Sequence, residues 1–262
     1  MKQDVPVIRF DSLDRTGIVR HGFSTKKGGV SDGIYSTMNL GLNRGDDIEN
    51  VKKNFKIMAQ TLGVPYEKMV LSDQTHTVNI KKISYDDAGK GLIKEKDYKD
   101  VDGIMTNENG IVLVTFYADC VPLFFLDPVK KVIALSHSGW RGTVNKMGKV
   151  TVEKMKQEYG CNPEDILACI GPSICQKCYE VSEDVALEFA EKFGNSDMFY
   201  KKENGKYQLD LWMANEMVLK EAGIENIENR RICTCCNSEY LFSHRKTNGK
   251  RGNLAAFMML CE

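Results

Sequence analysis

Residues 120–137, CVPLFFLDPVKKVIALSH, contain the clearest folding signal in this chain. Two runs rich in β-branched and aromatic side chains, residues 121–126 and 131–136, flank DPVK at residues 127–130. Strand-forming runs separated by Asp and Pro in a short polar segment are typical of two strands joined by a turn. The stretch therefore predicts a β-hairpin.

The hairpin predicts a functional pair at its open end. If Leu126 pairs with Lys131, then Cys120 lies opposite His137. Directly opposed residues of antiparallel strands have Cβ atoms about 5 Å apart on one face. A thiolate and an imidazole at that separation can share a zinc ion or act as nucleophile and base. Pro122 cannot donate to a ladder, which predicts an edge strand or irregular pairing at the strand start.

His76 is the natural third member of a metal site. It ends the stretch SDQTH at residues 72–76, which follows a short apolar segment, so we expect it near the end of a strand. Two His and one Cys leave a fourth coordination position for water or substrate, the pattern of a catalytic zinc site. The alternative is that each of the three side chains is merely buried or hydrogen-bonded.

The remaining sequence predicts a mixed fold. Helical and strand patterns alternate irregularly and no linker divides the chain, which indicates an α+β or mixed α/β single domain over residues 1–262. Apolar spacing and capping residues predict helices over residues 48–62, 144–159, 183–193 and 211–222. Further strands are expected over residues 78–83, 111–117, 165–170 and 254–260.

Composition narrows the class of protein. The 262 residues include 36 basic and 36 acidic side chains, and zero net charge argues against a nucleic-acid partner. We find no signal-peptide pattern and no apolar run of about 20 residues, so we expect a cytoplasmic protein without a membrane partner. A neutral surface is compatible with a monomer or a homodimer. The nine cysteines are then expected to be reduced thiols.

Four of those cysteines form two C-x2-C pairs, Cys175 with Cys178 and Cys233 with Cys236. The gap between the pairs is far longer than the about 15–20 residues of a zinc ribbon. This spacing favours separate core or half-exposed thiols over a four-cysteine zinc site.

Several ordered motifs carry a family resemblance. ADCVP at residues 118–122 and SHSGWRG at residues 136–142 resemble the signature of the YfiH family, also labelled the laccase-domain, polyphenol oxidase or multifunctional purine nucleoside phosphorylase family. Further matches follow in order at residues 22–25, 28–31, 38–41, 45–47, 74–76, 102–103, 170–174, 179–181, 233–234 and 243–245. Residues 249–253, GKRGN, depart from the Gly-Arg pair usual before the last strand of this family.

The resemblance implies a fold, a metal and an activity. Members are α/β sandwiches with two sheets flanked by helices, and they bind zinc through one Cys and two His, which correspond to His76, Cys120 and His137. The implied reactions are phosphorolysis of adenosine, inosine and 5′-methylthioadenosine to base and sugar 1-phosphate, and hydrolytic deamination of adenosine to inosine. Purine nucleosides and phosphate are the implied small-molecule partners. Cu²⁺ is a possible alternative to Zn²⁺.

Other residues are candidates for roles in that chemistry. Cys120 and Asp119 are candidate catalytic residues, Asp119 as a base or as a residue that orients a ligand. Arg141 is a candidate phosphate clamp with a share in catalysis, because its planar fork suits an anion. Arg44 and Asn39 are candidate substrate-binding residues. The simpler alternatives are that Asp119 caps a turn, Arg141 pairs with a carboxylate and Asn39 stabilises its loop.

Three other functions remain open at this point. A copper-dependent polyphenol oxidase is one, although four histidines cannot build a multicopper cluster. A cysteine hydrolase or peptidoglycan-editing factor would use Cys120 as nucleophile. A binding module with structural zinc is the third. His21 is expected to be structural, and both it and His244 are left outside the metal set.

Overall fold

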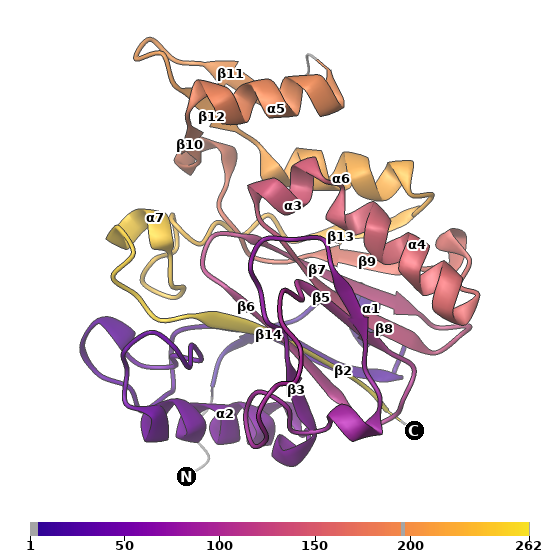
Figure 1. The fold of residues 1–262 in the computed structure, drawn as a ribbon. Helices are drawn as coiled ribbons and strands as arrows, with labels where there is room; N and C mark the ends of the chain where they lie inside the picture. Colours follow the sequence, from indigo (N-terminus) through magenta and orange to yellow (C-terminus); the bar gives the residue numbers. More distant parts are fainter. Residues whose placement is uncertain (1–4, 195–196, 262) are drawn as a thin grey trace.

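Two β-sheets stacked face to face form the centre of the molecule in the computed structural model, which describes residues 5–194 and 197–261 (Figure 1). The five-stranded sheet has the order β1 (Val7–Ile8), β2 (Val19–Ser24), β14 (Leu254–Leu260), β6 (Val112–Tyr117) and β3 (Met69–Leu71). The six-stranded sheet has the order β13 (Asn226–Asn229), β9 (Leu167–Ile170), β7 (Val121–Asp127), β8 (Val132–Ser138), β5 (Gly103–Thr106) and β4 (Ile80–Lys82).

The space between the two sheets is an apolar core. Because successive side chains of a strand point to opposite faces, Phe124 and Leu126 of β7 enter this core, where they join Leu113 of β6 and Met258 of β14. The alternate residues of each strand point outward beneath helices. Both faces of each sheet are therefore buried, which explains why the central strands are nearly continuous apolar runs.

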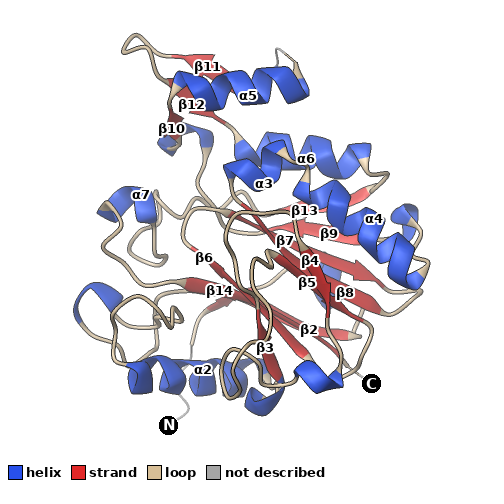
Figure 2. Ribbon diagram, in the orientation of Figure 1, coloured by secondary structure: helices blue, strands red, loops and turns tan. Residues whose placement is uncertain are grey.

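Helices cover the two outer faces of the stack (Figure 2). Helix α2 (Ile48–Leu62) packs Phe55 and Met58 against Phe257 on the five-stranded sheet. On the six-stranded sheet lie α4 (Met147–Tyr159), α3 (Trp140–Val144) and α6 (Leu211–Glu221). Two further short helices are α1 (Asp11–Asp14) and α7 (His244–Thr247). No helix within the described ranges is long and apolar enough to cross a membrane.

A third, small sheet departs from the two-sheet prediction. It has the order β10 (Glu180–Val181), β12 (Tyr207–Leu209) and β11 (Phe199–Lys201), and it lies with α5 (Glu183–Phe193) at the top of Figure 1. The mixed α/β class is confirmed, whereas the number of sheets was underestimated. These strands have two or three residues each, too few for a visible alternation of side chains.

Most expected elements are present at or near their expected bounds. Helices α2 and α5 and strand β14 match, and α6 ends one residue earlier than expected. The helix expected over residues 144–159 is wrong at its start, because α3 ends at Val144 and α4 begins at Met147. Lys146 interrupts the run with a φ of 57°, outside the helical region.

The predicted hairpin forms, but its register was wrong by two positions. Pro122, and not Cys120, pairs with His137, and Asp127 pairs with Val132. The turn comprises residues 128–131 because Oδ1 of Asp127 accepts hydrogen bonds from the amides of Val129 and Lys130, both at 2.9 Å. A shift of two residues keeps every side chain on its predicted face.

Of the two alternatives that Pro122 predicted for β7, the edge strand is wrong, whereas the pairing at the strand start is irregular. Strand β7 lies inside the six-stranded sheet, between β8 and β9. Pro122 is tolerated because it is the second residue of β7 and lies beyond the end of the pairing with β9, which stops at Leu123 and Ile170. The carbonyl of Pro122 still accepts a hydrogen bond from Gly171 at 2.9 Å.

Candidate metal centre and its cavity

Three ligand-type side chains meet where the two sheets come together at one end. His137 lies near the end of β8, Cys120 directly precedes β7, and His76 lies in the loop between β3 and β4. One nitrogen of each His and the Sγ of Cys120 all lie within 4.8 Å of one another. The two imidazole rings are perpendicular, with centroids 4.9 Å apart. The structure thus brings together the three residues predicted from the sequence.

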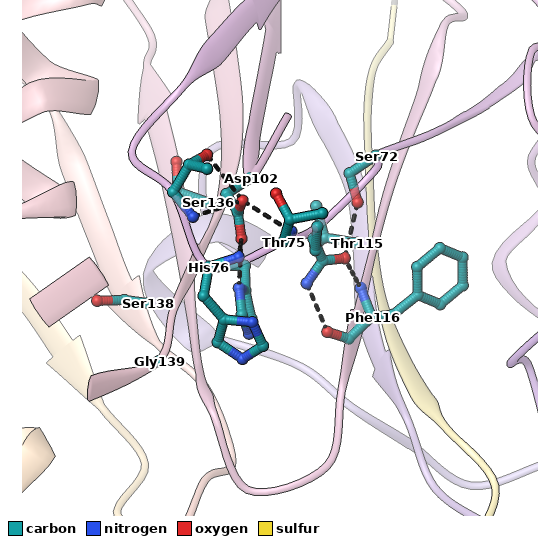
Figure 3. Close-up of polar contacts among 12 residues, drawn as sticks. Ser72, Thr75, His76, Asp102, Thr115, Phe116, Ser136, Ser138 and Gly139 are labelled. Carbon is teal, nitrogen blue, oxygen red and sulfur yellow. Dashed lines mark hydrogen bonds and ion pairs between the residues drawn. The ribbon is translucent and has the colours of Figure 1, made fainter. Parts of the chain in front are cut away.

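Asp102 fixes the geometry of both histidines. Its carboxylate accepts the backbone N–H groups of Thr75, His76 and Thr77 at 2.9–3.0 Å, and also the Thr77 hydroxyl (Figure 3). Oδ1 of the same carboxylate lies 2.8 Å from Nδ1 of His137. That contact leaves Nε2 of His137 as the ligand atom, the arrangement in which a second residue orients a metal-binding imidazole.

The electrostatics of the site favour a thiolate. Burial alone would raise the pKa of the Cys120 thiol, but the positive charge of His137 and hydrogen bonds to both histidines outweigh it and lower that pKa. For His137, burial is outweighed by the Cys120 thiolate and by Asp102, so its pKa is raised. Burial opposes ionisation of Asp102, yet His137 and the backbone amides lower its pKa to about 2. Without a metal ion, Cys120, His137 and Asp102 favour one another's charged forms; binding of a metal would release the proton on Nε2 of His137.

Gly139 lies directly against the side chains of His76, Cys120 and His137. A Cβ at this position would lie 3.1 Å from Cδ2 of His76 and 3.2 Å from Sγ of Cys120. Its φ of −69° is open to any residue, so the requirement for glycine comes from space and not from backbone conformation. A larger residue would push the ligands apart.

The loop before Cys120 is held by Asp119. This residue has a φ of 86°, and its carboxylate accepts the hydroxyl of Thr234 and the amide of Arg245, both at 2.6 Å. Both carboxylate oxygens are therefore engaged, and the side chain is buried outside the cavity wall. This placement fits a residue that positions Cys120, which is the ligand-orienting role predicted for Asp119 as the alternative to a base.

The His–Cys–His set suits a metal ion of zinc type. Tetrahedral zinc holds nitrogen at about 2.0–2.1 Å and sulfur at about 2.3 Å, so its ligand atoms are about 3.3–3.8 Å apart. The three atoms lie within 4.8 Å of one another, a limit that includes this spacing, and Asp102 and Gly139 support the three side chains. His76 is exposed and all three residues line a cavity, which leaves a coordination position accessible.

The cavity has a volume of about 420 Å³ and two arginines in its wall. Arg44 lies in an exposed loop, whereas Arg251 is buried and its Nε has no hydrogen-bond partner among the described residues. Burial and the charge of Arg44 lower the pKa of Arg251 to about 10, so the group remains a cation at neutral pH. Within the described ranges neither arginine forms an ion pair with a carboxylate. This wall can receive an anion.

The structure separates two other predicted residues from the cavity. Asn39 is fully buried, and its amide is used to bind Gly41, Asn253 and Asp46 at 2.8–2.9 Å. Arg141 is exposed on α3 and stacks on the ring of Trp140 at 4.3 Å. Neither lines the wall that contains Arg44 and Arg251.

No role was predicted for Asp102, Arg251 or Gln74, although Asp102 and Gln74 lie in the family motifs and Arg251 lies in the GKRGN stretch. Gln74 bridges the Phe116 backbone, donating from Nε2 at 2.8 Å and accepting at Oε1 at 2.7 Å (Figure 3). Asp102-Gly103 was part of the family pattern. The sequence does not show, however, that the Asp102 carboxylate binds residues that are distant in the chain. His21 is buried and structural as expected, and His244 lies outside the ligand set.

The two C-x2-C pairs lie together, although the long gap between them favoured core or half-exposed thiols over a shared site. The Sγ atoms of Cys175, Cys178, Cys233 and Cys236 all lie within 4.8 Å of one another. The two pairs follow β9 and β13, which are adjacent parallel strands that end side by side at Ile170 and Asn229. Strand pairing therefore closes the long gap in the sequence.

The fold and the site place this chain in a class of mixed α/β proteins with a His–Cys–His candidate metal centre. Comparison with known proteins shows the family to which it belongs. Residues 20–261 match the family described as multi-copper polyphenol oxidoreductase laccase. The chain belongs to this family, and the resemblance to YfiH proteins inferred from the motifs is confirmed.

Relatives of this chain carry the names of purine nucleoside enzymes. The chain is 37% identical over 248 residues to purine nucleoside phosphorylase YlmD of Bacillus subtilis, covering 92% of this chain and 88% of the relative. It is 36% identical over 251 residues to adenosine deaminase RL5 of an unknown prokaryote, covering 92% and 94%. The hypothetical protein YfiH of Bacillus licheniformis has a TM-score of 0.91 at 32% identity, covering 97% of this chain and 96% of the other.

Proposed function

We propose that this protein is a zinc-dependent purine nucleoside enzyme. It cleaves adenosine, inosine and 5′-methylthioadenosine with phosphate to give the base and a sugar 1-phosphate, and it deaminates adenosine to inosine. The names of the relatives support the reaction classes. Zinc and the range of substrates are what the resemblance to the YfiH family implies, and the His–Cys–His ligand set supports the metal.

One observation carries the proposal. The His76–Cys120–His137 set opens into a cavity of about 420 Å³ that has Arg44 and Arg251 in its wall. A volume in that range suits a ligand of nucleoside size. Phosphorolysis needs a cationic place for phosphate beside a nucleoside, and this cavity offers both.

Zinc held by His76, Cys120 and His137 supplies a Lewis acid and lowers the pKa of a bound water or polarises an oxygen. The residues around the three ligands hold the ligand atoms in position. Asp102 keeps Nδ1 of His137 engaged and Nε2 free, and Gly139 leaves room for the three ligands to converge. Asp119 and Asn39 act as positioning residues, one for the Cys120 loop and one for residues 41–44, which border the cavity.

Arg44 and Arg251 bind phosphate in this account. Arginine presents a planar fork of donors that matches phosphate, and the buried Nε of Arg251 is a donor in need of an acceptor. Lys96 also lines the cavity, but it is paired with Asp73. The arginines are therefore the cations available to the anion.

Replacement of His76 by Ala tests the metal assignment. We expect bound zinc and both activities to be lost together, because two ligands cannot hold the ion tightly. Zinc content by mass spectrometry and product formation by chromatography are measured on the same sample. Full activity in a zinc-free His76→Ala protein would contradict a metal mechanism.

Replacement of Arg251 by Gln tests the phosphate site. The KM for phosphate should rise by about tenfold or more, since a charge-assisted hydrogen bond contributes about 1.5–3 kcal/mol. Deamination needs no phosphate and should change little. Arg141→Gln is the matched comparison: if it, and not Arg251→Gln, raises the KM for phosphate, then the anion binds near Trp140.

A second candidate function rests on the alignment of Cys120, His137 and Asp102. A thiol of lowered pKa beside an imidazole that is oriented by a carboxylate also suits nucleophilic catalysis by a cysteine hydrolase. The two candidates differ in their response to chelation. An activity that survives metal removal and is abolished by alkylation of Cys120 would favour the hydrolase.

A further inference from the structure

A second group of ligand-type side chains lies outside the cavity, at the base of the small sheet. It consists of Cys175, Cys178, Cys233 and Cys236, which we call the four-cysteine cluster. All four are free thiols. The first pair flanks a single helical turn, Gln176–Cys178, and the second pair lies in the loop that follows β13.

The spacing of the sulfur atoms is compatible with one tetrahedral ion. Sγ of Cys178 lies 3.5 Å from Sγ of Cys236, and all four Sγ atoms lie within 4.8 Å. A zinc ion with four sulfur ligands at about 2.3 Å places them about 3.8 Å apart. Four free thiols this close together are enough to supply all the ligands of a closed, four-coordinate site.

The backbone around the cluster favours negative charge on one of the four sulfur atoms, that of Cys233. Amides of Cys175 and Cys236 point to Sγ of Cys233 at 3.3 and 3.4 Å. Such N–H donors stabilise sulfur that carries negative charge. The guanidinium of Arg245 lies close by, on the carbonyl of Cys178 at 3.3 Å.

We propose that the four-cysteine cluster binds one zinc ion as a structural site distinct from the cavity. Soft thiolate ligands in a tetrahedral arrangement select zinc, and a full set of four leaves no open position for a substrate. The ion joins the loop after β9 to the loop after β13.

The position of this ion connects it to the candidate metal centre. Thr234 follows Cys233 and donates its hydroxyl to Asp119 at 2.6 Å, and the amide of Arg245 donates to the other oxygen of Asp119. Asp119 in turn precedes Cys120. A zinc ion at the cluster therefore steadies the segment that places Cys120, without contacting the substrate.

The double variant His76→Ala/Cys120→Ala isolates the cluster, because it lacks two ligands of the cavity site. We expect it to retain about one zinc ion per chain after dialysis, with sulfur neighbours at about 2.3 Å in X-ray absorption. Adding Cys178→Ser and Cys236→Ser should remove this ion. Cys235→Ser is the matched control and should leave it bound.

Thiol labelling of the unaltered chain provides a readout that needs no variant. Cys236 is exposed, so N-ethylmaleimide should label it readily if it holds no metal. We expect labelling to be slow until a strong chelator removes zinc.

Thermal stability provides a separate readout. In a chain with the cavity site intact, Cys178→Ser/Cys236→Ser should lower Tm by about 5 °C or more, while Cys235→Ser should not.

Several results would overturn this proposal. In the His76→Ala/Cys120→Ala protein, these are a folded chain that contains no zinc or that contains iron in its place. In the unaltered chain, they are rapid labelling of Cys236 before chelation or disulfide bonds within the cluster. Zinc content is measured in a variant without two cavity ligands, and neither the labelling nor the Tm measurement needs turnover. Failure of the nucleoside activity would therefore leave the outcome of these tests unchanged.

Discussion

The Asp102 carboxylate is the point at which the His76 loop and the His137 ring meet. It collects three amides and one hydroxyl from residues 75–77, and it also contacts Nδ1 of His137. These contacts hold His76 at a φ of 69°, a conformation unfavourable for a residue with a Cβ. One side chain thus orients two of the three candidate ligands.

Asp102→Asn should weaken zinc binding by about 10–100-fold, the usual effect of removing a residue that orients a ligand. The amide nitrogen cannot accept the hydrogen bonds that the carboxylate oxygen accepts, so the His76 loop loosens. Competition with a chromogenic chelator measures the affinity, and circular dichroism checks the fold. An unchanged affinity would show that the loop and His137 hold their places without this carboxylate.

At the residue scale, the sequence indicated the three residues of the candidate metal centre better than the residues that support them. His76, Cys120 and His137 were identified because His and Cys are few and chemically distinctive. Asp102 and Arg251 were missed because their roles depend on partners distant in the chain, and charged residues are common in any sequence. The four cysteines were misjudged because the rule on spacing assumes one continuous motif.

The β7–β8 hairpin shows how one side chain sets the register of an element. Asp127 is fully buried and holds the turn through the amides of Val129 and Lys130. This places Val132, and not Lys131, at the start of the return strand. His137 thereby reaches the same end of the sheet as Cys120.

Asp127→Ala should destabilise the protein by about 1–3 kcal/mol, because two amides of the turn lose their acceptor. Asp127→Asn keeps an oxygen acceptor and should cost clearly less. Urea denaturation of the two variants measures the difference in the free energy of unfolding. Equal losses in both variants would mean that the charge, and not the turn hydrogen bonds, is what matters.

Elements with strong local signals were predicted well. Helices α2 and α5 follow from apolar spacing and from cap residues at their ends. Lys146 could not be recognised as a break, because nothing in its chemistry requires a φ of 57°. The order of strands in the sheets depends on contacts between distant segments and had no local signal.

At the scale of the whole molecule, the candidate metal centre depends on the passage of the chain from one sheet to the other. Strand β6 ends at Tyr117 in the five-stranded sheet, and β7 begins at Val121 in the six-stranded sheet. The few residues between them include Cys120. The positions of the three candidate ligands therefore depend on how the two sheets pack. A change that loosens this packing should also displace the ligands.

His21 makes the stability of the molecule depend on pH. Its Nε2 accepts the amide of Phe10 at 2.9 Å, and burial lowers the pKa of His21 to about 4, although Asp14 opposes the shift. The unfolded chain binds this proton below a pKa of about 6.5 and the folded chain only below about 4. Folding is therefore favoured above about pH 6.5, and stability is lost as the pH falls through this window.

The free energy of unfolding should fall by up to about 3 kcal/mol more in the unaltered chain than in His21→Gln between about pH 7 and about pH 4. Glutamine provides an acceptor for Phe10 but does not titrate. Denaturation curves at several pH values measure both slopes. Parallel slopes would show that His21 is not the titrating group.

The most direct test of the central claim is the fate of adenosine incubated with the pure protein, with and without phosphate, before and after zinc is removed. Our account predicts adenine and ribose 1-phosphate only when phosphate is present, and inosine in its absence. Both activities should disappear on chelation and return when zinc is restored. Unchanged adenosine in the presence of a zinc-loaded cavity site would contradict the account.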